Sequence, residues 1–373
     1  MLIPRPRPHP LCGRLPERYG EGMMPFPARD VSDFLPTASL AVLRQRARVL
    51  KTVREFFDTR GYWEVQTPLL SHDAPLDSHL VPFTTEWWPG GIAPATGAPT
   101  FSANVLYLQT SPEFCMKRLL AAGADAIYQL GSVFRNGESG SSHNPEFTML
   151  EWYRTGDTLN AQLQLVEDLV DSVYTELKKD RPGLQSPARP FLRTTYRQAF
   201  QRELGFDVFS QTTQNLVDAA RERQLTPPPG LTDSDHDGWL NFLLALLVEP
   251  HLGRERPEFL CDYPASQAAL ARIRPGDPPV AERFELYDRG VELCNGYVEL
   301  TEPRELSQRI AADSLRREQE GLPPLQSESR LLQAMQSGLP ESVGVALGFD
   351  RLCMLALGLE TIDEVIPFPL SRA

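Results

Sequence analysis

The chain has 373 residues, of which 41% are hydrophobic and 23% charged, and its formal net charge is -12 at pH 7. This composition is typical of a soluble globular protein with enough apolar material for one large domain or two ordinary ones. It excludes a broad basic surface for long tracts of nucleic acid, because lysine and arginine contacts to phosphates dominate such binding. No apolar run approaches the roughly 20 residues of a membrane span, and the N-terminus lacks the apolar core of a signal peptide, so we expect a cytoplasmic protein.

The first third of the chain begins with a proline-rich stretch and then turns to regular structure. Prolines are too frequent over residues 1–37 for a packed core, which predicts a disordered tail. Apolar residues at helical spacing predict a helix over 39–60, followed by a strand within 61–71. A further helix is predicted to begin at "SPEFCMKRLL", where Ser111 can cap its start.

The remaining elements suggest one domain over residues 38–373, which is long enough for a catalytic domain. Two strand-like runs surround a polar loop, and an amphipathic helix and a proline-rich connection follow. The expected ranges are strands over 126–135 and 146–154, a helix over 159–180, a mostly helical insertion over about 191–280, strands over 283–300, a helix over 303–320, and a strand running into a helix over 343–358. Because strands cluster before and after helices without βαβ alternation, we predict an α+β fold with an antiparallel sheet flanked by helices.

The segment "EFTMLEWYR" has an unusual set of side chains on one strand face. Successive residues of a strand point to opposite faces, so Phe147, Met149, Glu151 and Tyr153 share one face. Arg135 ends the preceding strand. A nucleotide and an amine would fit this set, with the aromatic ring stacking on a base, the guanidinium binding a phosphate, and the carboxylate and phenol holding an ammonium group. The alternative is a half-exposed strand with solvated charges.

A predicted hairpin around "YDRG" brings two carboxylates together. If Asp288 and Arg289 form a two-residue loop, Glu285 and Glu292 face each other across the strands. Like charges in these positions repel unless a cation lies between them, and Mg²⁺ carried by ATP would supply one. The alternative is a hairpin with a different register.

The segment "SVGVALGFDRL" predicts a strand with a smooth surface. Gly344, Ala346 and Gly348 alternate onto one face, where a ligand can approach the backbone closely, and Arg351 follows in the next helix. Ordinary close packing of the strand against a helix is the alternative interpretation.

Three segments resemble the three motifs of class II aminoacyl-tRNA synthetases. The helix over 39–60 with "GYWEVQTP" is similar to motif 1, "FRN" with "HNPEFTMLEWY" to motif 2, and "GVALGFDRL" to motif 3. Within this class, "PEFTMLEWY" and "VELCNGYVEL" resemble the lysine branch, but no stretch here corresponds to its N-terminal anticodon-binding barrel. With "TSPEFCMKRLL" and "YPASQAAL" added, the chain resembles the elongation factor P lysine ligase family over its whole length beyond the tail.

The resemblance implies an ATP-dependent ligase that uses Mg²⁺. Such an enzyme activates (R)-β-lysine as an adenylate and transfers it to a lysine ε-amine of elongation factor P. It further implies a homodimer and no role for tRNA. Two alternatives remain: a short lysyl-tRNA synthetase-like enzyme that charges tRNA, and a non-catalytic paralogue that regulates a partner.

The resemblance also implies a set of site residues. Catalysis would rest on Arg135 and Arg351. ATP would be bound by Arg135, Asn136, Asn144, Phe147, Glu292, Leu293, Gly348 and Arg351. The amino-acid substrate would be held by Ser111, Glu113, Glu151, Tyr153, Asn295, Glu299 and Ala346. Magnesium would be bound by Glu285 and Glu292.

Three positions distinguish this chain within the class. Ser111 and Ala346 stand where synthetases usually have alanine and glycine, and by the resemblance both favour the ligase. The methyl group added at Ala346 changes the pocket floor, and one methyl group is worth about 1 to 3 kcal/mol of discrimination. The family usually has glutamate directly after Arg-Asn of motif 2, whereas this chain has Gly137 followed by Glu138. Either Glu138 substitutes through a shifted loop or a contact to a substrate is lost.

Overall fold

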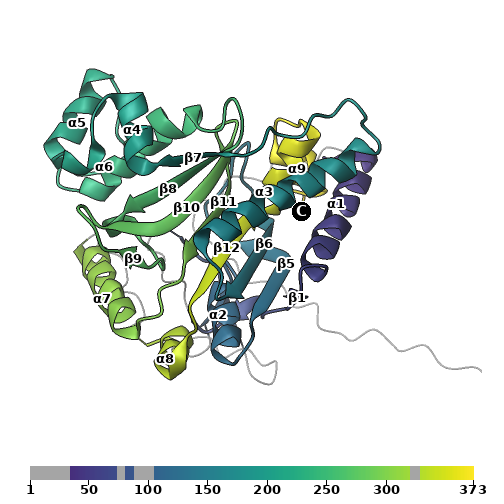
Figure 1. Cartoon of the computed structure of the whole chain (residues 1–373), viewed down its shortest axis with the longest axis horizontal. Coiled ribbons are helices and arrows are strands. Elements are labelled where there is room, and N and C mark those ends of the chain that lie inside the picture. The colour runs from purple at the N-terminus through teal and green to yellow at the C-terminus, as the bar shows by residue number, and fades with distance from the viewer. Residues whose placement is uncertain (1–33, 74–79, 88–104, 320–327) are drawn as a thin grey trace, which may run out of the picture. The chain divides into compact units, whose positions relative to one another are not determined.

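One mixed β-sheet organises the part of the chain that the structure describes, residues 34–73, 80–87, 105–319 and 328–373 (Figure 1). This computed structural model orders the strands β1-β5-β6-β12-β11-β10-β8-β7, with β9 paired to β10. Their bounds are, in that order, β1 Trp63–Glu64, β5 Ala126–Phe134, β6 Glu146–Thr155, β12 Ser342–Gly348, β11 Val291–Val298, β10 Val280–Asp288, β8 Glu258–Pro264, β7 Leu192–Thr195 and β9 Ile273–Arg274. Neighbouring strands are antiparallel except β1 with β5 and β7 with β8. The predicted α+β fold is confirmed, and parallel pairing is added at both edges of its sheet.

Three helices cover one face of the sheet: α1 (Leu40–Asp58), α3 (Leu159–Lys178) and α9 (Phe349–Leu357) (Figure 1). Their apolar residues form one buried core with Leu150 and Trp152 of β6. Because side chains alternate along a strand, the odd-numbered residues of β6 face away from this core. The predicted division of β6 into two faces is therefore confirmed.

A second group of helices packs on the other side of the sheet: α2 (Glu113–Ala121), α7 (Pro303–Gln319) and α8 (Arg330–Gly338). Their apolar residues form a core together with Tyr153 of β6 and Ile127 of β5. A small separate sheet has the order β2-β4-β3, with bounds β2 Leu70–Ser71, β4 Val105–Leu108 and β3 Thr84–Glu86. Sequence patterns predicted α2 and α7 but not α8.

The insertion predicted over 191–280 is helical in its middle. It contains α4 (Tyr196–Leu204), α5 (Thr213–Glu222) and α6 (His236–Leu243), which continues as a π-helical segment over Leu244–Val248. Buried side chains of these helices build a core of their own. The same stretch also supplies β7, β8 and β9, so both of its ends belong to the main sheet.

The tail predicted over residues 1–37 lies outside the described residues as far as residue 33. At its end, Thr37 donates hydrogen bonds from Oγ1 to the carbonyl oxygen of Ile366 (3.0 Å) and from its N–H to that of Pro367 (3.0 Å). The last residue assigned to the tail is therefore bonded to the domain.

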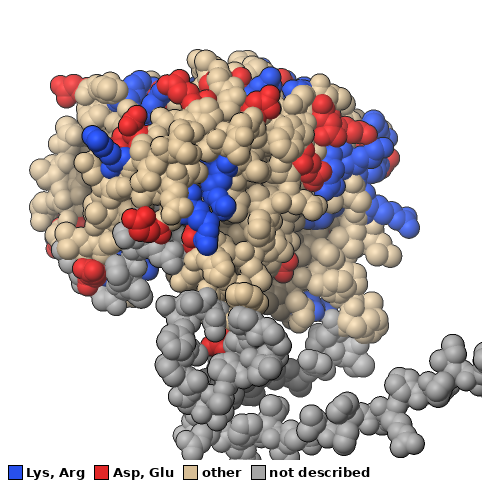
Figure 2. Space-filling model, turned by 90° about the horizontal axis from the view of Figure 1, so that it is seen from below, with Lys and Arg blue, Asp and Glu red and all other residues tan. Residues whose placement is uncertain are grey.

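One face of the molecule shows how charged side chains are distributed. On the face shown in Figure 2, Lys and Arg side chains are interspersed with Asp and Glu. Within the described ranges, the helices are too short or too polar to cross a membrane.

Candidate active site

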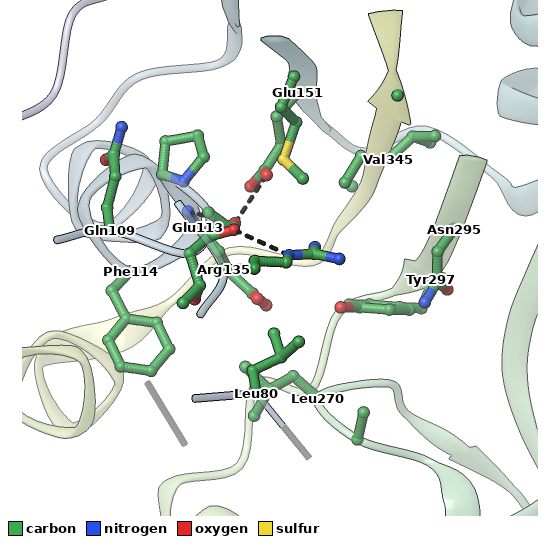
Figure 3. Close-up of a pocket in the computed structure, with 18 of the residues that line it drawn as sticks. Leu80, Gln109, Glu113, Phe114, Arg135, Glu151, Leu270, Asn295, Tyr297 and Val345 are labelled. Atoms are coloured by element: carbon green, nitrogen blue, oxygen red, sulfur yellow. Dashed lines mark hydrogen bonds between the residues drawn. The ribbon is translucent and has the colours of Figure 1, made fainter. Parts of the chain in front are cut away.

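A cavity of about 480 Å³ lies on the odd-numbered face of β6 (Figure 3). It collects predicted site residues that are far apart in the sequence: Ser111, Glu113, Arg135, Asn144, Phe147, Glu151, Tyr153, Glu285, Glu292, Leu293, Asn295, Ala346, Gly348 and Arg351. Two predicted residues do not line it. Asn136 is exposed, and its backbone N–H donates to the carbonyl oxygen of Val81 (2.9 Å). Glu299 lies behind the cavity floor.

The floor of the cavity is the smooth face of β12. Gly344 pairs with Tyr153 and Ala346 with Glu151 of the neighbouring strand. A Cβ atom at Gly344 would collide with Glu299 Oε1 and with the Tyr153 ring. The floor of small residues predicted from the sequence is confirmed, and the missing side chain at Gly344 leaves room for Glu299.

Glu151 is a deeply buried carboxylate that faces the cavity. Only 1% of its surface is exposed. Ser111 Oγ donates to its Oε2 and the Tyr153 hydroxyl to its Oε1, both at 2.7 Å. Burial, with the nearby carboxylate of Glu113 adding to it, raises the pKa of Glu151 to about 7. A cationic ligand would stabilise the ionised form, as predicted for an ammonium-binding residue.

Two more carboxylates meet at a buried lysine near Glu151. Lys117 Nζ lies 2.6 Å from Glu113 Oε1 and also forms an ion pair with Glu299 Oε2. Burial raises the pKa of Glu299 to about 8, although Lys117 opposes this shift. This end of the cavity therefore has three carboxylates and one ammonium group, which leaves an excess of negative charge for a ligand to neutralise.

A second part of the cavity, called the arginine end below, presents two guanidinium groups. Arg135 lies over the Phe147 ring, with Cζ 5.2 Å from the ring centroid, and its Nη1 is 3.5 Å from Glu138 Oε1. Arg351 donates to the carbonyl oxygens of Ser142 (3.1 Å) and Glu292 (2.9 Å). Paired arginines at one end of a cavity suit a phosphate group.

The hairpin of β10 and β11 has a different register from the predicted one. Its loop is Arg289–Gly290, so Glu285 pairs with Asn295 and Glu292 pairs with Tyr287. The register shifts between Leu286 and Tyr287 of β10, where β11 has one extra residue, Leu293. This bulge turns Glu292 onto the face of Glu285. The direct pairing that we predicted is wrong, but both carboxylates line the cavity.

Glu285 and Glu292 are suited to bind a metal ion that enters the cavity together with a bound phosphate ligand. Glu285 accepts hydrogen bonds from Tyr263 (2.5 Å), Tyr287 (2.7 Å) and Arg283 (2.6 Å). Partial burial and the charge of Glu285 raise the pKa of Glu292, whose side chain is 39% exposed. Among the described residues, no group of three or more metal-ligating side chains forms a complete cage. Magnesium is commonly held by one or two carboxylates plus substrate phosphates, and this pair matches that arrangement.

Sequence reasoning missed several residues of the site. Lys117 carries one signal, the spacing of four residues from Glu113 on a helix. Glu138, for which the sequence left two alternatives open and which was not among the predicted site residues, lines the cavity beside Arg135. Arg283 donates to Asn295 Oδ1 (3.2 Å) as well as to Glu285, which orients two predicted residues. Each of these side chains is charged and forms an ion pair with another charged residue of the site.

The chain matches the family model for class II tRNA synthetases (D, K and N) over residues 30–372. Among curated proteins it is similar to the elongation factor P–(R)-β-lysine ligase of Vibrio cholerae, with 44% identity over 92% of this chain and 99% of that protein. The proteins of the same name from Edwardsiella ictaluri and Histophilus somni are 45% and 44% identical over 92% and 91% of this chain, and over 99% and 98% of their own lengths.

Proposed function

Since the chain belongs to the class II tRNA synthetase family, we propose that it activates (R)-β-lysine with ATP and transfers it to a lysine ε-amine of elongation factor P. The observation that carries this proposal is that one cavity is lined both by the buried carboxylate of Glu151 and by the guanidinium groups of Arg135 and Arg351. Its support from known proteins is the name and full-length similarity of the relatives. The enzyme is an ATP-dependent ligase that releases AMP and pyrophosphate.

The acidic end matches the charge of the amino-acid substrate. Glu113, Glu151 and Glu299 with Lys117 leave a formal surplus of two negative charges, and β-lysine carries two ammonium groups. Binding these groups there points the substrate carboxylate toward the arginines. The Ser111 hydroxyl adds a hydrogen bond to Glu151 that an alanine could not make.

In the first step, the substrate carboxylate attacks the α-phosphorus of ATP, and pyrophosphate leaves. The carboxylate is already ionised at pH 7, so catalysis consists of positioning and charge neutralisation. Arg135 binds the α-phosphate and Arg351 the leaving pyrophosphate. Glu285 and Glu292 would hold magnesium, which neutralises phosphate charge when bound.

In the second step, the ε-amine of the acceptor lysine attacks the carbonyl carbon of the adenylate. A C–N bond forms, the bond from the carbonyl carbon to the phosphate oxygen breaks, and AMP leaves with the electron pair. The amine loses one proton, which the AMP phosphate or solvent can accept. No side chain of the cavity has to change its protonation state for this step.

The test is a transfer assay with labelled β-lysine, ATP and Mg²⁺. The acceptors are elongation factor P, the same protein with its acceptor lysine replaced by arginine, and total tRNA. We expect label on elongation factor P alone, located by mass spectrometry of its peptides. Label on tRNA would instead support the synthetase alternative. If no amino acid promotes pyrophosphate exchange, the regulatory alternative replaces the ligase.

The proposal includes a cytoplasmic homodimer, as the family resemblance implies. Light scattering coupled to gel filtration measures this directly, and we expect twice the mass of the 41.8 kDa chain. A mass of one chain at concentrations used for the assay would contradict the dimer without affecting the proposed reaction.

A further inference from the structure

Lys117 is a buried cation that does not line the cavity. It lies on α2, one turn after Glu113, and only 2% of its surface is exposed. Its ammonium group contacts Glu113 Oε1 and Glu299 Oε2 and lies 5.8 Å from the centroid of the Tyr297 ring. The two carboxylates therefore separate Lys117 from the space that a ligand can enter.

Each of the two carboxylates uses one oxygen for Lys117. Among the described residues, Glu299 Oε1 has no hydrogen-bond partner, and it lies against Gly344 on the cavity floor. Glu113 lines the cavity directly (Figure 3). A buried carboxylate oxygen without a partner costs free energy, unless a ligand supplies the missing hydrogen bond. The second oxygens are thus available for a cationic group of the substrate.

A purely structural role would not require a lysine here. Buried ion pairs contribute little net stability compared with apolar residues of similar volume. Burial lowers the pKa of Lys117, but Glu113 and Glu299 outweigh this effect and raise it above the usual value. The ammonium group therefore stays charged and opposes the protonation of Glu299, which an apolar residue could not do.

We propose that Lys117 is a positioning residue for substrate binding: it anchors one oxygen of Glu113 and one of Glu299, so that their remaining oxygens hold an ammonium group of the amino-acid substrate. This inference rests on the proposed function, because it assumes a substrate with two ammonium groups. Lys117 also offsets one of the three negative charges of the acidic end. The two formal negative charges that remain match the two ammonium groups of the substrate.

Two variants separate positioning from packing. Lys117→Met keeps most of the side-chain volume and removes the charge. Lys117→Ala leaves a space that propylammonium can fill, since this ion has the atoms that the substitution removes. The measurements are pyrophosphate exchange dependent on β-lysine and calorimetric binding of β-lysine, each with and without propylammonium chloride, and with 1-propanol as the neutral control.

We expect both variants to raise KM and Kd for β-lysine at least about tenfold, since truncating one partner of a buried charge pair is costly. KM for ATP should stay within about twofold of wild type. Propylammonium should restore binding in Lys117→Ala but not in Lys117→Met, and 1-propanol should restore neither. Equal rescue by 1-propanol, or an unchanged Kd in Lys117→Met, would overturn the proposal.

Should Lys117→Ala fail to fold, Lys117→Met still decides the question through its pH profile. Glu299 is faced by Lys117, Glu113, Glu151 and Gly344. Without the cation, the acidic limb of kcat/KM for β-lysine should move to higher pH, and an unmoved limb would contradict the proposal. Wild type that binds β-lysine without exchange would contradict the proposed function alone. If wild type catalyses pyrophosphate exchange with β-lysine and the Lys117 variants have the same constants, the role of Lys117 alone is contradicted. If wild type does not bind β-lysine, both the proposed function and the role of Lys117 are overturned.

Discussion

The two ends of the cavity hold their charged groups in different ways. At the acidic end, Glu151 and Glu299 are each only 1% exposed and are fixed by contacts to Ser111, Tyr153 and Lys117. At the other end, the side chains of Arg135 and Arg351 are 25% and 19% exposed. One end is therefore buried and pre-arranged, whereas the other, the open end, is partly exposed to solvent.

The contacts of Arg135 show what this difference means. Its polar contacts to Thr110 (3.4 Å) and Glu138 (3.5 Å) are long for hydrogen bonds. A phosphate could replace them with shorter, charge-assisted bonds at little cost. In the proposed reaction we therefore expect the acidic end to select its ligand by fit, and the arginine end to gain its best contacts as charge develops on the phosphate. Substitutions at the two ends should therefore affect different kinetic constants.

The largest expected effect is that of Arg135→Ala at the open end. Removing a group that stabilises developing charge in a transition state lowers kcat by roughly 10² to 10³. KM for β-lysine should change little, because Arg135 does not contact the carboxylates of the acidic end in the structure. Pyrophosphate exchange at varied ATP and β-lysine concentrations measures both constants.

A matched control for this variant is Arg221→Ala. Arg221 lies on α5 and forms surface ion pairs with Asp218 and Asp233. It should keep wild-type kinetics. If Arg135→Ala raised KM for β-lysine and spared kcat, the two ends would not be functionally separate.

The next effect is that of Glu299→Gln at the buried end. The amide loses the charge that pairs with Lys117 and with a substrate ammonium group, so KM for β-lysine should rise roughly 30-fold or more while KM for ATP is kept. Glu151→Gln should act in the same direction. Glu203→Gln, which removes a charge at a partly buried position outside the cavity beside Arg202, serves as the control. An unchanged KM for β-lysine in both cavity variants would remove the ammonium assignment.

A smaller effect is expected from Ala346→Gly on the cavity floor. Ala346 lies beside Glu151 and Asn295 in neighbouring strands, so its methyl group shapes the acidic end. Removing it should shift the ratio of kcat/KM for β-lysine over α-lysine toward α-lysine by roughly tenfold, the value of one methyl group. Competition between the two substrates in one exchange assay gives the ratio, and a constant ratio would show that selectivity arises elsewhere.

The sequence predicts the parts of this site that follow from local periodicity. Alternation along β6 was enough to place Phe147, Glu151 and Tyr153 on one face, and alternation along β12 placed Gly344 and Ala346 on the floor. Both follow from the twofold repeat of a strand, which does not depend on distant residues. The class II motifs then predicted that both strands contribute to one site, as the family resemblance implied.

The parts that failed depend on turn geometry and on distant partners. Arg289 and Gly290 have φ of 55° and 77°, the backbone of a two-residue hairpin loop that favours glycine in its second position. This signal could have corrected the loop, but nothing local predicts the bulge that turns Glu292. Lys117 was missed because its second partner, Glu299, is brought near only by the fold.

The smallest effect concerns pH and again contrasts the two ends. The pKa of Glu151, raised mainly by burial, is about 7 in the unliganded protein. Below this pH the carboxyl group is neutral and cannot pair with an ammonium group. The kcat/KM for β-lysine should therefore fall more steeply as pH drops from 7 to 6, because protonation of Glu151 adds a factor approaching tenfold per unit to that of Glu299, whose pKa is about 8. KM for ATP should not follow this limb, and in Glu151→Gln only the contribution of Glu299, whose pKa is about 8, should remain.

The stability of the folded protein should change with pH in the opposite direction to kcat/KM. The assignment of the acidic limb to Glu151 can therefore be tested without an activity assay. A carboxyl group whose pKa is raised on folding, here from 4.5 to about 7, favours the folded state at low pH and loses that contribution as pH rises through 7. The midpoint of thermal unfolding of wild type, relative to Glu151→Gln, should therefore fall between pH 5 and pH 8. Saturating β-lysine should reverse this fall, because the bound ammonium group stabilises the ionised carboxylate. Parallel curves for the two proteins would mean that Glu151 is not the group that titrates.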